Sequence, residues 1–150
     1  MKAIVLTLLF GLLFISCENG NSEEFNDSNT EQIELVPENF IDQLPLQLAE
    51  NSGLVHFNNL FWTFNDSGGE NVLYGFNRWG EINIEIQLVN AENNDWEDIA
   101  QDEEYIYIGD FGNNSGSRKD LKVYKINKSE ITAEPQQNLE AEIIGFTFSN

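Results

Sequence analysis

The stretches LFWTFNDSGG, from Leu60 to Gly69, and YIYIGDFGNN, from Tyr105 to Asn114, follow one pattern. Each begins with an aromatic-rich run typical of a β-strand and continues into an acidic loop that contains glycine. A further apolar run that includes Leu-Tyr or Val-Tyr follows each loop. The chain therefore contains a tandem repeat built from strands.

The spacing of the two copies indicates the architecture. Asp66 and Asp110 are 44 positions apart, and Tyr74 and Tyr124 are 50 apart. These spacings are close to the roughly 40 to 50 residues of one four-stranded propeller blade. We therefore expect an all-β, propeller-like fold of about two four-stranded antiparallel blades.

Short apolar runs separated by Asn, Asp and Gly clusters predict the individual strands. Asn58-Asn59 and Trp79-Gly80 are expected to be turns between strands, and a helical turn is expected at most around Asn39 to Leu44. The predicted strands cover about residues 53–57, 60–65, 72–77, 82–88, 97–100, 105–109, 121–126 and 142–148.

Two blades are fewer than the typical four to eight of known propellers. Residues 40–150 are therefore expected to form a partial propeller. A truncated gene product or fragment is the leading explanation, and self-assembly of copies into a ring is the alternative.

The first seventeen residues are predicted to be a signal peptide. Lys2 precedes an apolar run from Ala3 to Ile15, which is shorter than the roughly 20 residues of a membrane-spanning helix. A small residue before the only cysteine, Cys17, is typical of a bacterial lipoprotein signal, in which that cysteine is lipidated. Ordinary signal cleavage is the alternative, because Phe14 departs from the commonest form of this motif.

Residues 18–39 are predicted to be an acidic, flexible tether. Removing residues 1–17 takes away one lysine and no acid, so six basic and 26 acidic residues give a net charge of −20. This charge argues against nucleic-acid binding and leaves the lipid on Cys17 as the expected membrane contact. The expected location is the bacterial cell envelope, as an outer-membrane or cell-surface lipoprotein.

Several motifs in order resemble a family of secreted bacterial β-propeller proteins, mostly uncharacterised and similar to the six-bladed, TolB-like propellers. The motifs are ENSGL (50–54), LFWTFNDSGG (60–69), VLYGFN (72–77), NDWEDIA (94–100), YIYIGDFGNN (105–114) and RKDLKVYKI (118–126). The resemblance covers about residues 48–127 and implies a full propeller. More distantly, the chain resembles the SdiA-regulated propellers and the calcium-dependent gluconolactonase and regucalcin group.

The acidic loops suggest a calcium site, because calcium takes six to eight oxygen ligands from carboxylates, amides and carbonyls. No EF-hand spacing is present, so any such site must combine several loops on one expected face. Asn65, Asn94 and Asn113 are neutral helpers in this hypothesis. The candidate metal ligands are Glu50, Asp66, Asp95, Glu97, Asp98 and Asp110.

An alternative role for Asp66 and Asp110 is to stabilise their own turns by accepting backbone N–H groups. Arg118 or Lys119 is a possible partner for the acids around Trp96. The three tryptophans, Trp62, Trp79 and Trp96, are expected mainly in the core.

No catalytic motif is recognisable, and the only histidine, His56, lies in an apolar context. The leading functional hypothesis is therefore a binding module for an unknown ligand or protein, with calcium as a possible cofactor. The alternatives are a calcium-dependent hydrolase of the lactonase or phosphoesterase type, and a non-functional truncated fragment.

Overall fold

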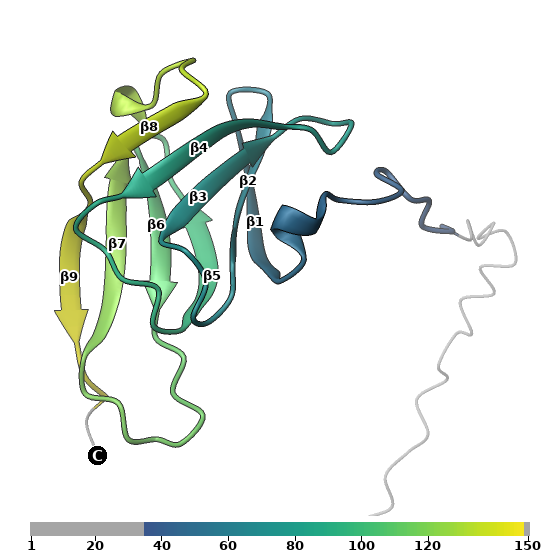
Figure 1. Cartoon of the computed structure of the whole chain (residues 1–150). Helices are drawn as coiled ribbons and strands as arrows, with labels where there is room; N and C mark the ends of the chain where they lie inside the picture. The colour runs from purple at the N-terminus through teal and green to yellow at the C-terminus, as the bar shows by residue number, and fades with distance from the viewer. Residues whose placement is uncertain (1–34, 149–150) are drawn as a thin grey trace, which may run out of the picture. The chain divides into compact units, whose positions relative to one another are not determined.

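The computed structural model describes residues 35–148, and these form two β-sheets (Figure 1). The predictions for the signal peptide, Cys17 and most of the tether lie outside the described residues. No helix in the described part of the chain is both long and apolar enough to cross a lipid bilayer. The strands are β1 (Asn51–Phe57), β2 (Leu60–Asn65), β3 (Val72–Phe76), β4 (Ile82–Leu88), β5 (Trp96–Gln101), β6 (Tyr105–Asp110), β7 (Leu121–Asn127), β8 (Gln136–Leu139) and β9 (Glu142–Phe146).

Sheet A has the strand order β1-β2-β3-β4-β8, and sheet B has the order β5-β6-β7-β9. All neighbouring strands are antiparallel except β4 and β8, which are parallel. Neither sheet closes on itself, which confirms the expected all-β, incomplete propeller-like fold.

The eight predicted strands are present, with small changes at their ends, but β8 was not predicted. It follows Pro135, and its sequence QQNL lacks the apolar alternation that signals a strand. The backbone N–H of Glu85 on β4 donates to the carbonyl of Pro135 at 2.8 Å, and the parallel pairing continues from there. The tertiary structure therefore forms this strand despite its weak local signal.

The short helical turns also differ from the sequence prediction. The turn expected around Asn39 to Leu44 is not helical; instead, η1 is a 3-10 turn at Leu46–Leu48. A second 3-10 turn, η2, spans Lys128–Glu130. The Asn58-Asn59 hairpin is confirmed, since both residues have the positive φ angles that asparagine tolerates.

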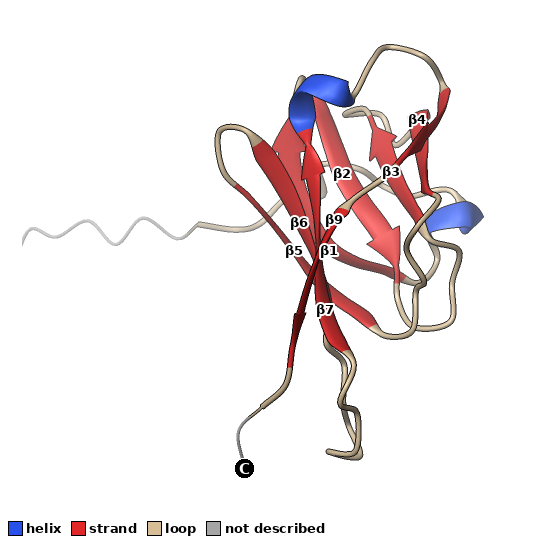
Figure 2. Ribbon diagram, turned by 90° about the vertical axis from the view of Figure 1, so that its left-hand side faces the viewer, coloured by secondary structure: helices blue, strands red, loops and turns tan. Residues whose placement is uncertain are grey.

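The two sheets pack face to face over one apolar core (Figure 2). Trp62 and Phe64 from β2 meet Trp96 and Tyr124 from sheet B, and the rings of Phe64 and Trp96 make an edge-to-face contact at 5.3 Å. Trp62 and Trp96 are fully buried, as expected, whereas the prediction for Trp79 was wrong because this side chain is 72% exposed. Trp79 lies in the tight turn after β3, where its ring points away from the core.

Strands β1 and β5, the first strands of the two sheets, lie side by side. Ser52 Oγ donates to the carbonyl of Glu97 at 2.9 Å, and Gln101 Nε2 donates to the carbonyl of His56 at 2.9 Å. Gly53 is required here, because its φ is +63° and an added Cβ would lie 2.8 Å from Ile99 Cγ2. The first strands of the two repeats are therefore adjacent, as in neighbouring blades.

Strand pairing defines which residues of the two repeats are equivalent. Tyr74 pairs with Thr63, and Tyr124 pairs with Ile108. If the two tyrosines are equivalent, their partners Thr63 on β2 and Ile108 on β6 are equivalent too, and these are 45 positions apart. The same shift makes Asp110 correspond to Asn65 rather than to Asp66. The sequence alignment that equated the two aspartates was therefore one residue out of register.

Candidate carboxylate site

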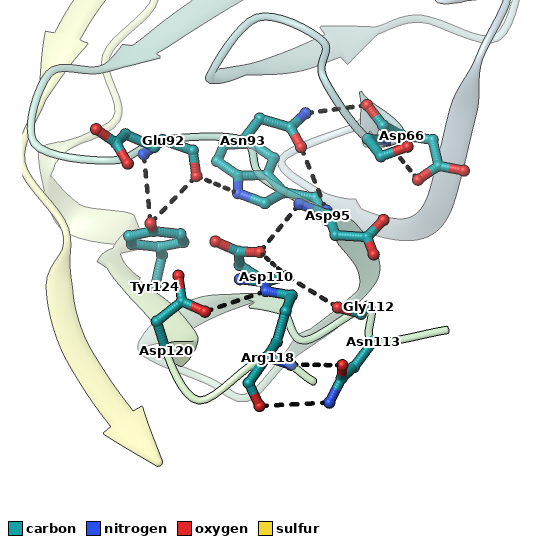
Figure 3. A network of polar contacts seen from close by, with 12 residues as sticks. Asp66, Glu92, Asn93, Asp95, Asp110, Gly112, Asn113, Arg118, Asp120 and Tyr124 are labelled. Carbon is teal, nitrogen blue, oxygen red and sulfur yellow. Dashed lines mark hydrogen bonds and ion pairs between the residues drawn. The ribbon is translucent and has the colours of Figure 1, made fainter. Parts of the chain in front are cut away.

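Three loops meet at the end of the domain where β2, β4 and β6 finish (Figure 3). The side chain of Asn93, in the β4–β5 loop, donates to the carbonyl of Asn65 at 2.8 Å and to that of Asp66 at 3.2 Å. The Gly112 N–H, in the β6–β7 loop, donates to the carbonyl of Asp95 at 3.1 Å. The expectation that these loops share one face is therefore confirmed.

Asp110, the last residue of β6, is completely buried. Its Oδ1 accepts hydrogen bonds from the backbone N–H of Asp95 at 3.0 Å and from Arg118 Nη1 at 2.9 Å. Its Oδ2 has no hydrogen-bond partner within residues 35–148. Asp110 thus joins the β4–β5 loop to the β6–β7 loop, which is a different role from capping its own turn.

Arg118 is the counter-charge of this buried acid. Nη1 also donates to the carbonyl of Gly112 at 2.9 Å, and Nε lies 3.3 Å from Asp120 Oδ1. Burial alone lowers the pKa of Arg118, but the hydrogen bonds to the two aspartates outweigh burial and raise it. Asn113 fixes the same loop, because its Oδ1 accepts from the Arg118 N–H at 2.8 Å. Arg118 therefore stays charged and holds the loop in place.

Asp66, Asp95 and Glu97, which we call the carboxylate cluster, lie close together at this end of the domain. Burial and then the charges of Asp95 and Asp66 raise the pKa of Glu97. Asp95 and Glu97 flank the Cα of Gly112: an added Cβ there would lie 2.1 Å from Asp95 Cγ and 2.6 Å from Glu97 Oε1. Gly112 is the residue that leaves room for both carboxylates.

The carboxylate cluster has no basic partner among residues 35–148. The ion pairs in this part of the chain join Arg118 to Asp110 and Asp120, and Lys125 to Glu142. The expectation that Arg118 or Lys119 pairs with the acids around Trp96 was therefore wrong for the described residues. The β6–β7 loop instead directs Arg118 toward the buried end of β6.

The two remaining acids of the predicted set are exposed, and neither is among the charges that raise the pKa of Glu97. Glu50 is exposed, and it contributes its backbone carbonyl, which accepts from the Asp66 N–H at 2.8 Å. Asp98 is exposed, and its Oδ1 accepts from the adjacent Ile99 N–H at 2.8 Å. Asp66 Oδ1 accepts from the Ser67 N–H, as expected for an aspartate that stabilises its own turn.

Asn93 is an important residue that the sequence interpretation missed in favour of Asn94, which is exposed. Its Oδ1 accepts from the Trp96 N–H at 3.2 Å while its amide crosses to the β2–β3 loop. An asparagine three residues before a strand-starting tryptophan was the available signal, because asparagine readily bonds nearby backbone N–H groups.

Within residues 35–148, no group of three or more His, Cys, Asp or Glu side chains is arranged to hold a metal ion. His56 lies near the opposite end of β1 from Glu50, and its ring is 5.1 Å from that of Phe61.

Comparison with known proteins gives no match: no protein-family model, no curated protein and no solved structure matches this chain. The resemblance to secreted six-bladed propellers therefore stays a prediction.

Proposed function

We propose that this protein is a binding module whose carboxylate cluster binds a cation, with calcium as the first ion to test. The observation that carries the proposal is the convergence of Asp95 and Glu97 on Gly112, with Asp66 close enough to repel Glu97. Three acids without a basic partner among the described residues favour a cation, because a nearby positive charge relieves both their repulsion and the cost of burial.

Calcium fits the chemistry of this end of the domain. It prefers carboxylate, carbonyl and amide oxygens and accepts irregular geometry with six to eight ligands. Since the described acids are not already arranged around a metal position, binding requires the carboxylates to close on the ion, with water or backbone oxygens completing the shell. The Asp110–Arg118 pair, together with the hydrogen bond from the Asp95 N–H to Asp110, holds the β4–β5 and β6–β7 loops next to each other at the cluster.

We further propose that the module acts in the bacterial cell envelope and is attached to a membrane by a lipid on Cys17. The apolar run after Lys2 and the small residue before Cys17 support this part of the proposal. The acidic tether would then hold the folded domain away from the membrane surface, because anionic lipid head groups repel its charge.

A binding role is better supported than hydrolysis. The sole histidine, His56, lies away from the carboxylate cluster, so it does not supply a general base there. A hydrolase would need the bound ion to polarise a lactone or phosphoester. Release of product from such substrates in the presence of calcium would favour the hydrolase alternative.

Thermal unfolding with calcium and with chelator tests the cation proposal. An ion that binds only the folded state stabilises it by about 2.7 kcal/mol at a concentration 100 times the dissociation constant. We expect calcium to raise the unfolding midpoint of the full chain and the Glu97→Gln variant to lose most of this response. Glu103→Gln, an exposed site in the β5–β6 turn, is the matched control. An unchanged midpoint at millimolar calcium would contradict the proposal.

A further inference from the structure

Each sheet has two faces, which can be compared position by position. We call the face of sheet A that packs on sheet B its forward face; it carries the cross-strand pair Leu73 and Ile86. The equivalent pair on sheet B is Val123 and Ile144, which lies on the face of sheet B turned away from sheet A. This second surface is the forward face of sheet B.

Equivalent positions on the two forward faces differ in burial. Leu73 and Ile86 are 0% exposed, because sheet B covers them, whereas Ile144 is 43% exposed and Val123 is half-buried. Phe146 and Phe148 continue the same surface, with their rings in edge-to-face contact at 5.8 Å. The forward face of sheet B therefore repeats an apolar surface that is covered in sheet A.

The rear face of sheet A is the face turned away from sheet B. In the repeat it corresponds to the face of sheet B that covers the forward face of sheet A. On sheet B the covering residues include Ile106, Ile108 and Tyr124, and their counterparts on sheet A are Phe61, Thr63 and Tyr74. Residues 41–48 lie over this rear face through Ile41, Leu44 and Leu48. We call this segment the strap.

The strap end of the molecule has exposed apolar side chains of its own. Leu46 is 86% exposed, and Phe40, Leu54 and Trp79 are also exposed. A groove of about 260 Å³ lies between the strap and sheet A and is lined by Phe40, Leu44, Leu54 and Phe61 among others. Figure 1 shows η1 of the strap and β9 on opposite sides of the domain.

Charge does not divide the two surfaces. Lys122 pairs with Asp110 and Gly145, so it lies on the face of sheet B opposite the forward face. Lys125, on the forward face, is paired with Glu142 at 2.9 Å. At the strap end, Arg78 lies over the rings of Phe40 and Trp79. Contact between the two surfaces is therefore favoured by their exposed apolar side chains and their correspondence in the repeat.

We propose that the forward face of sheet B binds the strap end of sheet A in a second copy of this chain. The interface is head-to-tail, because it joins two different surfaces, and the strap that covers the rear face of sheet A forms part of it. Such an interface adds copies until the rotation closes a ring, or it forms an open filament. This inference concerns assembly and is independent of the proposed cation site.

Sedimentation of the full chain over a range of concentrations tests the proposal, with one variant for each surface. Ile144→Glu blocks the forward face, and Leu46→Glu blocks the strap end. Each should weaken self-association at least about tenfold, since a loss of 1.4 kcal/mol already gives this factor. Ala133→Glu, on the exposed loop before β8, is the matched control and should associate like the unchanged protein.

Mixing the two blocked variants gives the sharper result. Ile144→Glu keeps a free strap end and Leu46→Glu keeps a free forward face, so an equal mixture should form one-to-one dimers while each variant alone stays monomeric. Phe148→Glu, at a 63% exposed position beyond β9, replaces Ile144→Glu if the latter does not fold by circular dichroism. A chain that stays monomeric, association that both variants leave unchanged, or a mixture that stays monomeric would each overturn the proposal.

Discussion

Asp110 occupies the place in sheet B that Asn65 occupies in sheet A, so the repeat exchanges an amide for a buried carboxylate at this position. The exchange is accompanied by Arg118, whose Nη1 lies 2.9 Å from Asp110 Oδ1. Asn65 instead donates through Nδ2 to the carbonyl of Gln47 at 2.8 Å. Equivalent positions in the two sheets therefore hold different loops in place.

Replacement of Asp110 by Ala should lower the free energy of unfolding by about 3 kcal/mol, because it leaves Arg118 without its buried counter-charge. The Asp95 N–H loses its acceptor at the same time. Urea unfolding of the two proteins measures the difference.

Asp120→Ala is the control for this change. Asp120 also lies beside Arg118, at 3.3 Å, but its side chain is 58% exposed. Exposed ion pairs contribute up to about 1 kcal/mol, so this variant should lose much less stability. Equal losses in the two variants would show that burial of Asp110 does not determine the strength of the pair.

Replacement of Gly112 by Ala should displace the carboxylate cluster. The new Cβ would lie within 2.6 Å of both Asp95 and Glu97, so at least one of these side chains must move. We expect lower stability and a weaker effect of calcium on the unfolding midpoint. Gly145→Ala is the matched control, because nothing lies within 4 Å of its added Cβ. A Gly112→Ala protein with unchanged stability would mean that the loop relaxes freely.

Much of the fold could be predicted from the sequence because it depends on local signals. Alternating apolar residues predicted β4, and the Asn58-Asn59 pair predicted a hairpin whose positive φ angles are present. The strand β8 could not be predicted, because its polar residues gain their pairing from β4, about fifty positions earlier. Long-range pairing leaves little trace in the residues that accept it.

The site could be predicted only in part. The order of the loops predicted that Asp66, Asp95 and Glu97 lie at one end of the domain. In an antiparallel sheet, the loops that follow every second strand lie at the same end of the sheet. The pairing of Arg118 with Asp110 depends on the path of the β6–β7 loop, which composition does not specify. A shift of one residue reverses the face that a strand residue occupies, so the alignment of Asp66 with Asp110 hid their different environments.

Replacement of Glu97 by Gln should raise the unfolding midpoint at pH 7. The pKa of Glu97 is raised in the folded state, so protonation of this carboxyl stabilises the folded protein. This contribution to the free energy of unfolding is present in acid and is lost as the pH rises through the folded pKa. Removal of this charge relieves the repulsion from Asp95 and Asp66. The advantage of the variant should disappear below the ordinary glutamate pKa of 4.5, as thermal unfolding at several pH values can show.

Asp102 provides a control of opposite sign. Its pKa is lowered by the hydroxyl of Tyr107, which donates at 2.6 Å, and then by the N–H groups of Tyr105 and Glu104. The contribution of Asp102 is present above the ordinary pKa of 3.8 and is lost as the pH falls through the folded value. Asp102→Asn should therefore lower the midpoint at pH 7, and a rise would contradict the assignment of these hydrogen bonds.

Replacement of Trp96 by Ala should cost about 3–5 kcal/mol, the usual range for loss of a fully buried tryptophan. Trp96 joins the two sheets, because its ring contacts Phe64 of sheet A and Tyr124 of sheet B, with centroids 5.3 and 5.8 Å away. Its Nε1 also donates to the carbonyl of Glu92 at 3.0 Å in the loop that leads to the carboxylate cluster. Trp79→Ala should change stability little, because that ring is largely exposed. Urea unfolding of both variants compares them directly, and similar losses would contradict the view that packing between the two sheets holds the domain together.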